Sequence, residues 1–335
     1  MSLSRRALLA SGLALPVALS ACAKPEAPKA LRIGQATTSL SFLPIWAARA
    51  FDSFAAAGLM LDWAAITGGD PATLAALDSG DIDLAAVGSD TALAAIAKGQ
   101  PFELVYVLMA KMSLELVGSN AFLQRTGVSP ADPLERRIGA LKGATAGVSA
   151  IGGAQDRMLR WIGAQGGVDP KSVQAALVGG PPAIQAAMEN KRIDAFLLSP
   201  PEAGIAEAGG YGKRLIAPAD DFPALKGLPN LVLVAKTQPD EAAVTRIKGG
   251  LAVLNKASAR VVADPDMAAD AIGARFFPKV PQAILREAVR SMADGVEGGG
   301  RFTPDTLLAL KAFSAGSDVA LPPGDAFWTN RYLEG

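Results

Sequence analysis

Two stretches of this chain, lying 111 positions apart, carry the same pattern of residues. Residues 68–90 read GGDPATLAALDSGDIDLAAVGSD, and residues 179–201 read GGPPAIQAAMENKRIDAFLLSPP, aligned without a gap. Each stretch predicts a Gly-Gly turn, a short helix with a proline near its start, a polar corner, Ile-Asp and an apolar strand. The identical pairs are Gly68/Gly179, Gly69/Gly180, Pro71/Pro182, Ala72/Ala183, Ala75/Ala186, Ala76/Ala187, Ile82/Ile193 and Asp83/Asp194. Such a repeat predicts two copies of one structural unit.

A second correspondence lies upstream of each copy. Residues 31–34 form a short strand pattern that opens into a Thr/Ser loop, and residues 144–148 form one that opens into a Ser/Gly loop. A helical pattern follows each loop, around residues 44–48 and 158–162. The chain therefore holds two strand–helix–strand units, which predict two doubly wound α/β lobes with mostly parallel sheets. One large α/β domain with a chance similarity is the alternative.

The connections between the lobes are predicted from two further strand-like runs. These runs, residues 114–117 and 230–234, suit a pair of strands that cross between the lobes. Their positions predict that lobe one comprises residues 31–119 and 230–335, and that lobe two comprises residues 120–229. Beyond residue 240 apolar residues recur at helical spacing, so we expect the C-terminal third to cover lobe one with helices.

The composition removes several classes of function. Lys and Arg total 32 and Asp and Glu total 32, without a polybasic run, so we expect no nucleic-acid partner. The chain has no histidine and one cysteine, which excludes Ser-His-Asp and Cys-His catalysis and His-ligated zinc. No GxSxG, GxxxxGK[ST] or SxxK motif stands in plausible surroundings. We therefore expect a binding protein, not an enzyme, with no cofactor and no metal.

The N-terminus has the pattern of an export signal. In residues 1–21, Arg5 and Arg6 precede an apolar run of 13 residues, shorter than the about 20 helical residues that span a bilayer. Cys22 follows Leu-Ser-Ala and resembles the lipid-modified cysteine of a bacterial lipoprotein; a buried free cysteine is the alternative. We therefore expect residues 22–30 to form a lipidated, solvated tether. The export route, twin-arginine or general secretory, stays open.

Polar and glycine-rich loops follow the predicted strands of both units. Ligands of doubly wound sheets bind beyond the carboxyl ends of the strands, so we expect these loops to line a cleft between the lobes. The candidate ligand-binding residues of lobe one are Thr37, Thr38, Ser39, Phe42, Gly69, Asp70, Ser89 and Asp90. Those of lobe two are Ser149, Gly152, Gly153, Pro200 and Glu202.

Many of these candidates also have a purely structural explanation. The hydroxyls of residues 37–39 suit a turn, Ser89 and Asp90 suit a helix cap, and Glu202 suits the start of a helix. Phe42 fits the core as well as the cleft.

Two features bear on the charge of the solute. Gly152 and Gly153 beside Ser149 would make a seat for an anion at a helix N-terminus, with tight helix–strand packing as the alternative. Asp90, if it faces the cleft, would repel an anion and favour a cation or a hydroxyl. The sequence assigns no arginine to the cleft. We therefore expect a neutral or singly charged organic solute and leave its identity open.

Taken together, these segments resemble the extracytoplasmic solute-binding proteins of ABC transporters, specifically the nitrate/sulfonate/taurine and thiamine-precursor group called NMT1-like. The matching stretches include LRIG, GLMLDW, ALDSGDIDLAAVGS, LKGATAGVS, VGGPPAIQAAM and RIDAFLLSPP, between about residues 31 and 235. The resemblance implies a two-lobed type II periplasmic-binding fold whose lobes hinge and close over a solute.

The resemblance also implies the partners and the location. We expect a small-molecule solute of the sulfonate, nitrate, taurine or pyrimidine-precursor class, an ABC permease and, through it, a cytoplasmic ATPase. A monomer in the periplasm or cell envelope is expected. A sensor or adaptor without transport is the alternative, and an enzyme on the same fold comes after it. The family's pyrimidine-precursor synthase consumes its own histidine, so that activity is excluded here.

Overall fold

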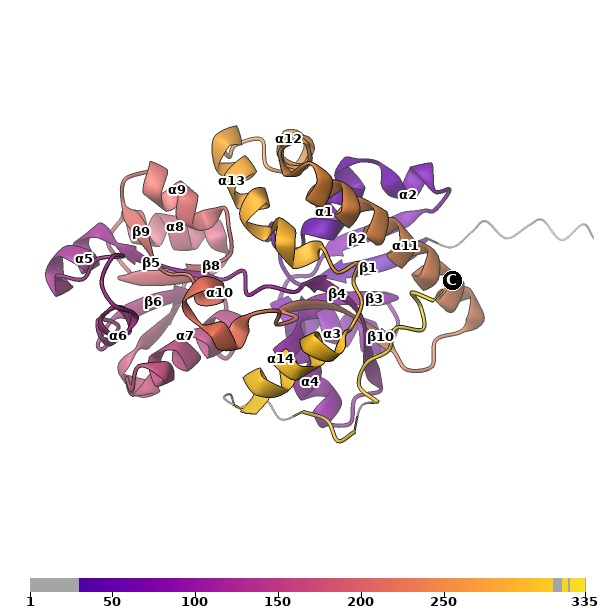
Figure 1. Ribbon diagram of the computed structural model, residues 1–335, viewed down its shortest axis with the longest axis horizontal. Coiled ribbons are helices and arrows are strands. Elements are labelled where there is room, and N and C mark those ends of the chain that lie inside the picture. Colours follow the sequence, from indigo (N-terminus) through magenta and orange to yellow (C-terminus); the bar gives the residue numbers. More distant parts are fainter. Residues whose placement is uncertain (1–29, 316–320, 325, 335) are drawn as a thin grey trace, which may run out of the picture.

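Two five-stranded mixed sheets form the centres of two lobes (Figure 1). The computed structural model describes residues 30–315, 321–324 and 326–334. The predicted signal peptide 1–21, Cys22 and all but the last residue of the predicted tether lie outside these ranges. The predicted α/β fold with two doubly wound mixed sheets is confirmed.

Sheet one has the strand order β2-β1-β3-β10-β4. Its strands are β1 (Leu31–Gln35), β2 (Leu61–Ala65), β3 (Leu84–Gly88), β4 (Phe102–Met109) and β10 (Leu231–Lys236). β1 is parallel to β2 and β3, whereas β10 is antiparallel to β3 and β4. Every residue of β3 and β4 is buried, as expected of apolar strands that helices cover on both faces.

Helices cover both faces of sheet one. One face carries α1 (Leu43–Ala50), α11 (Glu241–Ala263) and α12 (Pro265–Phe276), and the other carries α3 (Gly69–Ser79) and α4 (Ser89–Ala97) (Figure 1). A short helix, α2 (Ser53–Ala56), follows α1. In α11 the buried residues Ile247, Leu251 and Leu254 recur at helical spacing and face lobe one, as the sequence predicts.

Sheet two repeats this plan with the order β7-β6-β8-β5-β9. Its strands are β5 (Glu115–Ser119), β6 (Thr145–Val148), β7 (Gln174–Leu177), β8 (Ala195–Leu198) and β9 (Gly212–Ile216). The surrounding helices are α5 (Asn120–Thr126), α6 (Leu134–Gly139), α7 (Ala154–Gln165), α8 (Pro181–Glu189), α9 (Glu202–Ala208) and α10 (Pro218–Asp221). β5 is the antiparallel strand of this sheet.

The pairing of β5 moves the first lobe boundary. The predicted boundary after residue 119 assigns this strand to lobe one, but β5 is hydrogen-bonded between β8 and β9 of sheet two. The chain therefore leaves sheet one after β4 and crosses at residues 110–114. A strand pattern identifies a strand but not its partners, because the pairing depends on segments about 80 or more residues away in sequence.

The two crossing segments are tied to each other by side chains. Ser113 lies in the first crossing, and its hydroxyl is 3.1 Å from the hydroxyl of Ser199 after β8. Asn230 lies in the second crossing, and its amide Nδ2 donates to Ser113 Oγ at 3.2 Å. The backbone N–H of Asn230 donates to the carbonyl of Met109 at 2.8 Å. The crossing at Asn230 thus lies directly against the end of β4.

The repeated Ile-Asp pair has one structural role in both lobes. Asp83 Oδ2 accepts the backbone N–H of Arg32 at 2.9 Å, and Asp194 Oδ2 accepts the backbone N–H of Thr145 at 3.0 Å. In return, the N–H of Asp83 donates to the carbonyl of Arg32, and the N–H of Asp194 donates to the carbonyl of Thr145. Each aspartate therefore joins the first strand of its unit to the strand that follows the repeat helix.

The isoleucine of the pair explains a second repeated residue. A Cβ on Gly34 of β1 would lie 2.6 Å from Ile82 Cδ1, and a Cβ on Gly147 of β6 would lie 2.7 Å from Ile193 Cδ1. Each glycine thus leaves the space that the isoleucine methyl group occupies. The first glycine of the Gly-Gly pair has the same conformation in both units, since Gly68 and Gly179 have φ of 104° and 114°. Only glycine adopts this conformation without strain.

The C-terminal helices contact both lobes, whereas the sequence predicts that they cover lobe one. α13 (Gln282–Met292) packs on α12 and also crosses α9 of lobe two, where a Cβ on Gly204 would lie 2.8 Å from Ile284 Cγ2. In α14 (Pro304–Ala315), Phe313 lies 6.1 Å from Trp161 of α7, between ring centroids. The C-terminal region therefore bridges the lobes on two sides.

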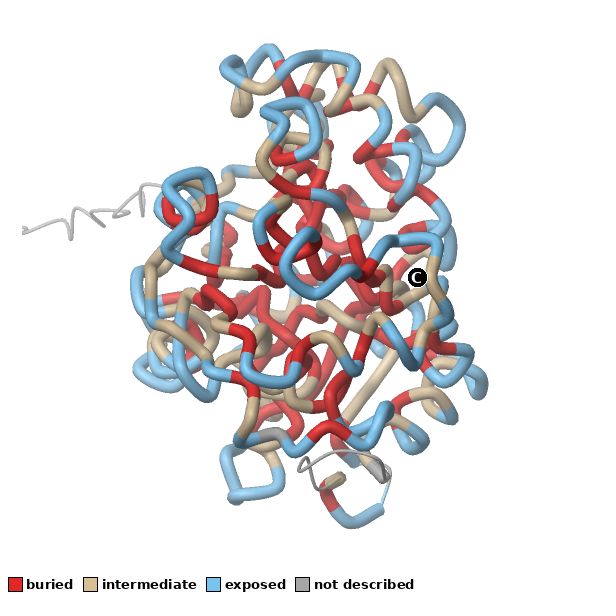
Figure 2. The backbone as a smooth tube through the Cα atoms, turned by 90° about the vertical axis from the view of Figure 1, so that its left-hand side faces the viewer, coloured by how far each residue is buried: buried red, intermediate tan, exposed pale blue. Residues whose placement is uncertain are grey.

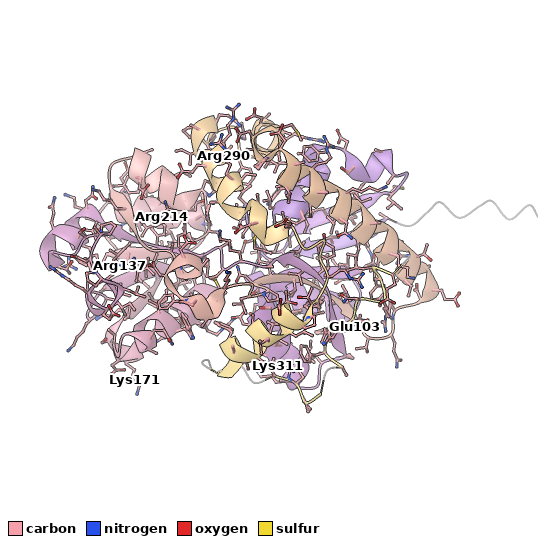
Figure 3. All side chains as sticks on the ribbon, in the orientation of Figure 1. Glu103, Arg137, Lys171, Arg214, Arg290 and Lys311 are labelled. Atoms are coloured by element: carbon pink, nitrogen blue, oxygen red, sulfur yellow. The ribbon has the colours of Figure 1, made fainter. Side chains whose placement is uncertain are left out.

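The end of the chain covers the outer edge of sheet one. The N–H of Leu104 in β4 donates to the carbonyl of Phe327, and the N–H of Thr329 donates to the carbonyl of Leu104. Glu103, labelled in Figure 3, accepts hydrogen bonds from Arg331 and from Tyr332. These contacts pair an edge strand that would otherwise expose free backbone groups.

Burial follows this architecture. Figure 2 shows buried residues along the middle of the molecule and exposed residues in the turns around it. Within the described residues, we find no helix that combines the length and the apolar character needed to span a membrane.

Candidate functional site

The lobes meet at the carboxyl ends of their parallel strands. Asp90 opens α4 directly after β3, and Arg157 lies in the first turn of α7, after β6. Arg157 Nε donates to Asp90 Oδ2 at 2.7 Å, and Arg157 NH2 donates to the hydroxyl of Thr91 at 2.7 Å. The two strand-end edges therefore contact each other at this point.

Arg157 is nearly saturated by acceptors. Besides Asp90 and Thr91 of lobe one, its NH1 group donates to the carbonyl of Gly152 in its own lobe. The side chain of Arg157 is 33% exposed and that of Asp90 is 14% exposed. This ion pair is thus half-buried, and charge-assisted hydrogen bonds there are stronger than at an open surface.

Two carboxylates of lobe one converge beside Gly88. A Cβ on Gly88 would lie 2.7 Å from Asp90 Oδ1 and 3.0 Å from Asp70 Oδ2, so a side chain at this position would collide with both. Asp70 Oδ2 accepts the Gly88 N–H at 3.3 Å. Burial, and then the negative charge of Asp90, raises the pKa of Asp70 to about 6, while Arg157 opposes the shift.

The loop before α7 is arranged differently from the expected anion seat. The N–H of Gly152 donates to Asp156 Oδ2 at 2.8 Å, and the N–H of Ser149 donates to Gln155 Oε1 at 2.7 Å. Side chains of the first helical turn thus accept the N–H groups that would hold an anion. Gly152 has φ of 72°, so a bulky residue there would strain the backbone before it could block a ligand.

The expected hydroxyl loop after β1 lies partly open. Thr37 and Thr38 are exposed, while Ser39 is half-buried and its hydroxyl is 2.8 Å from that of Ser41. The carbonyl of Ser39 accepts the indole N–H of Trp46 at 2.8 Å. Phe42 is 2% exposed and belongs to the core, so the structure does not bring it to the cleft surface.

The remaining lobe-one candidates have local roles. Gly69 has φ of 70°, and its carbonyl accepts the Thr73 hydroxyl at 2.9 Å. Ser89 is 3% exposed, and its N–H donates to the carbonyl of Asn230 in the second crossing. Gly69 therefore stabilises the turn before α3, and Ser89 fixes the second crossing. The polar groups named here are used within the protein.

Glu202 of lobe two lies in a network within its own lobe. Gln185 Nε2 of α8 donates to Glu202 Oε2 at 2.6 Å, and the hydroxyl of Tyr211 donates to Gln185 Oε1 at 2.7 Å. Burial raises the pKa of Glu202, and the hydrogen bond from Gln185 opposes that shift. Gly153 directly precedes α7 in an extended conformation and closes the loop from Ser149.

Pro200 lines a pocket away from these loops. The pocket, of about 50 Å³, lies beside the first crossing between lobe two and α13, with Glu115 and Arg214 in its wall. Arg214, labelled on lobe two in Figure 3, donates to Glu115 Oε1 at 2.7 Å. Burial raises the pKa of Glu115, and the charge of Arg214 opposes this. The pocket does not include Thr37, Asp90 or Ser149.

Sequence reasoning missed Arg157 and Thr91. A pointer to Arg157 existed, because it is the fourth residue of the helix that follows the first strand of lobe two. Whether its side chain reaches the opposite lobe depends on how the two lobes are placed relative to each other. The spacing of residues in the sequence carries no information on that placement. Among the described residues no group of three or more Asp, Glu or Cys side chains is placed to hold a metal ion.

Comparison with known protein families identifies the chain. The model of the NMT1-like family matches residues 6–272, most of the sequence and both repeat units. The chain belongs to the NMT1-like family. This confirms the resemblance read from the sequence motifs. A comparison with curated protein sequences found no match.

Solved structures share the fold of this NMT1-like protein. A protein from Bordetella bronchiseptica RB50 has a TM-score of 0.71 at 22% identity, over 91% of this chain and 96% of that chain. The alkanesulfonate-binding protein SsuA from Xanthomonas axonopodis pv. citri, bound to MOPS, has a TM-score of 0.65 at 18% identity, over 86% and 91%. The periplasmic nitrate-binding protein NrtA from Synechocystis PCC 6803 has a TM-score of 0.61 at 17% identity, over 77% and 70%.

Proposed function

We propose that this NMT1-like protein is the extracytoplasmic solute-binding component of an ABC importer and captures a small organic molecule between its lobes. The observation that carries the proposal is the facing of the two strand-end edges at Arg157 and Asp90. In doubly wound folds these edges are where ligands bind. A permease and, through it, a cytoplasmic ATPase would be its partners.

The comparisons support this role. A sulfonate-binding protein and a nitrate-binding protein share the fold over most of their length. The composition supports binding rather than catalysis, because the chain lacks histidine and its one cysteine lies in the N-terminal region. We therefore propose that the captured solute leaves the protein chemically unchanged.

We propose that exposed polar groups of both lobes contact the solute. Lobe one offers the exposed hydroxyls of Thr37 and Thr38, which follow β1, and the pair formed by Asp90 and Arg157 follows the neighbouring strand β3. Lobe two offers Ser149, whose side chain is half-buried at the end of β6. A solute held by both sets would bind to the assembled lobes rather than to either lobe alone.

The test is a thermal-shift screen of the mature protein against sulfonates, nitrate, neutral organic solutes and amines, followed by calorimetric titration. A solute at a hundredfold excess over its Kd should stabilise the protein by roughly 2.7 kcal/mol. Thr38→Val and Ser149→Ala should each weaken binding, whereas Thr245→Val, on the exposed side of α11, should not. A solute whose affinity none of the three variants changes would place binding elsewhere, and conversion of the solute to a product would refute the role.

We further propose that the protein is lipid-anchored through Cys22 after removal of residues 1–21. The support is the short apolar run that ends in the only cysteine of the chain. Cys22→Ser should abolish fatty-acid labelling and leave the precursor uncleaved, because the lipoprotein peptidase acts after lipidation. Equal labelling of the variant and the wild type would contradict the proposal.

A further inference from the structure

Backbone donors at the meeting edges are already used by carboxylates of the chain itself. The Gly88 N–H donates to Asp70, the Thr91 N–H donates to Asp90 Oδ1 at 2.7 Å, and the Gly152 N–H donates to Asp156. Helix N-termini normally attract anions through such donors. Here the helices α3, α4 and α7 each carry their own carboxylate in the first turn.

Arg157 is the cation that crosses between the lobes at this point. Its partners in lobe one are Asp90 and Thr91, and Asp156, next to it in the chain, is paired instead with Arg160 at 2.9 Å. An anionic solute that takes the Nε and NH2 donors of Arg157 must therefore separate it from Asp90 and Thr91. That separation would leave Asp90 and the adjacent Asp70 as two shielded carboxylates without a cation, which is costly.

We propose that Arg157, held by Asp90, determines the charge preference of the cleft and selects against solutes with an anionic head group. A neutral or cationic solute leaves this ion pair intact, whereas an anion has to break it. The inference rests on the proposed solute-binding role and adds the class of solute. Its contact with the opposite lobe makes Arg157 a specificity-determining residue.

The electrostatics of Asp70 agree with this assignment. The carboxyl has a raised pKa because of burial and the charge of Asp90, so negative charge is already disfavoured at this place. A further anion next to Asp70 would meet the same repulsion, while the positive charge of Arg157 would be shared between more acceptors.

The experiment compares anion binding by the wild type and by Asp90→Asn, a change that keeps the side-chain shape and removes its charge. Methanesulfonate and nitrate are the probes, titrated by calorimetry into the mature protein. We expect Asp90→Asn to bind methanesulfonate at least tenfold more tightly than the wild type. The double variant Asp90→Asn with Arg157→Gln should lose this gain, because the freed guanidinium is gone.

Two controls keep the result interpretable. Asp52→Asn removes the carboxylate of an exposed pair with Arg275, at 2.7 Å, and should leave anion binding at the wild-type level. If Asp90→Asn does not fold, Asp90→Ser serves instead, since it also removes the charge and keeps a small polar side chain in the first turn of α4.

Wild-type protein that binds methanesulfonate as tightly as Asp90→Asn would overturn the inference, and so would two proteins that both fail to bind it. Neither result touches the proposed function if a neutral solute or an amine still raises the unfolding temperature of the wild type. A wild type that binds no solute of any class, together with a gain of anion binding in Asp90→Asn, would instead refute the importer role and retain the charge preference.

Discussion

The two repeat units keep the same residues where they hold strands together and different residues where they face each other. In both units an aspartate closes the strand pair, Asp83 in lobe one and Asp194 in lobe two. In both, a glycine leaves room for the isoleucine before that aspartate. These shared positions lie within a lobe, so the demands on them are the same in both copies.

The cleft-facing positions of the units differ. Asp70 and Asp90 of lobe one stand where lobe two has Pro181 and Pro201. Lobe one therefore supplies carboxylates to the meeting edge, and lobe two supplies a cation, Arg157, from α7, the helix after β6. The comparison teaches that the fold tolerates a duplicated framework, while binding between the copies requires that their facing edges be complementary rather than alike.

The largest effect is expected where the shared aspartate is most buried. The Asp83 side chain is 4% exposed and is paired with Arg246, itself 14% exposed. Asp83→Ala should cost about 3 kcal/mol of folding free energy, because it leaves a shielded guanidinium without its partner. Burial raises the pKa of Asp83, but hydrogen bonds from Arg32 and Arg246 outweigh it and lower the pKa. The stabilisation is therefore present above the unfolded-state value of 3.8 and is lost on acidification below it.

The matched change in lobe two should cost less. Asp194 is 20% exposed, and its partner Arg125 is 57% exposed. Asp194→Ala should cost about 1 kcal/mol, mostly the lost hydrogen bond from the Thr145 N–H. Calorimetric unfolding of both variants measures the difference, and equal losses would contradict the argument from burial.

An effect of opposite sign, up to the size of that at Asp83, is expected at Asp70. Its pKa is raised from 3.8 to about 6, so ionisation of Asp70 lowers stability as the pH rises between these values. Asp70→Asn should therefore stabilise the protein at pH 8 by up to about 3 kcal/mol and by much less at pH 4. Thermal unfolding at the two pH values is the measurement. A gain that does not depend on pH would show that charge is not the cause.

A small effect, similar to that at Asp194, is expected at the repeated glycines, and it should be alike in both lobes. Gly34→Ala and Gly147→Ala would each bring a Cβ against an isoleucine Cδ1, at a cost of about 1 kcal/mol. Ile82→Val and Ile193→Val remove that methyl group and should offset most of the cost within the same lobe. Chemical denaturation of the single and double variants gives the coupling. Rescue in one lobe only would mean that the two frameworks are not equivalent.

Much of the fold could be predicted because its determinants are local or repeated. The helical spacing in α11, the apolar runs of β3 and β8 and the Gly-Gly turns are all visible in the sequence. The assignment of β5 to the first lobe was wrong because strand pairing depends on partners far away in the chain. The docking of the chain end on β4 could not be predicted either, since Phe327 and Thr329 carry no pattern that names Leu104 as a partner.

The candidate site was predicted in outline and not in its chemistry. Asp90 was proposed as a residue facing the cleft, and it does meet the opposite lobe. The expected anion seat stays a prediction, but two of its donors are occupied by the chain itself, because Gln155 and Asp156 in the first turn of α7 accept the N–H groups of Ser149 and Gly152. Phe42 was placed in the cleft as readily as in the core, and the packing of α1 buries it.

The sequence by itself determined the duplicated framework: Ile-Asp, the glycines beneath it and the strand–helix alternation predict the repeated strand–helix–strand unit of each lobe. Only the tertiary structure decided which groups the lobes present to each other, and that Arg157 pairs with Asp90 across them. The physical reason is range. Backbone propensity and strand closure act over neighbouring residues and leave a periodic trace, whereas an ion pair between lobes depends on the relative position of two independently formed sheets, which no spacing in the chain records.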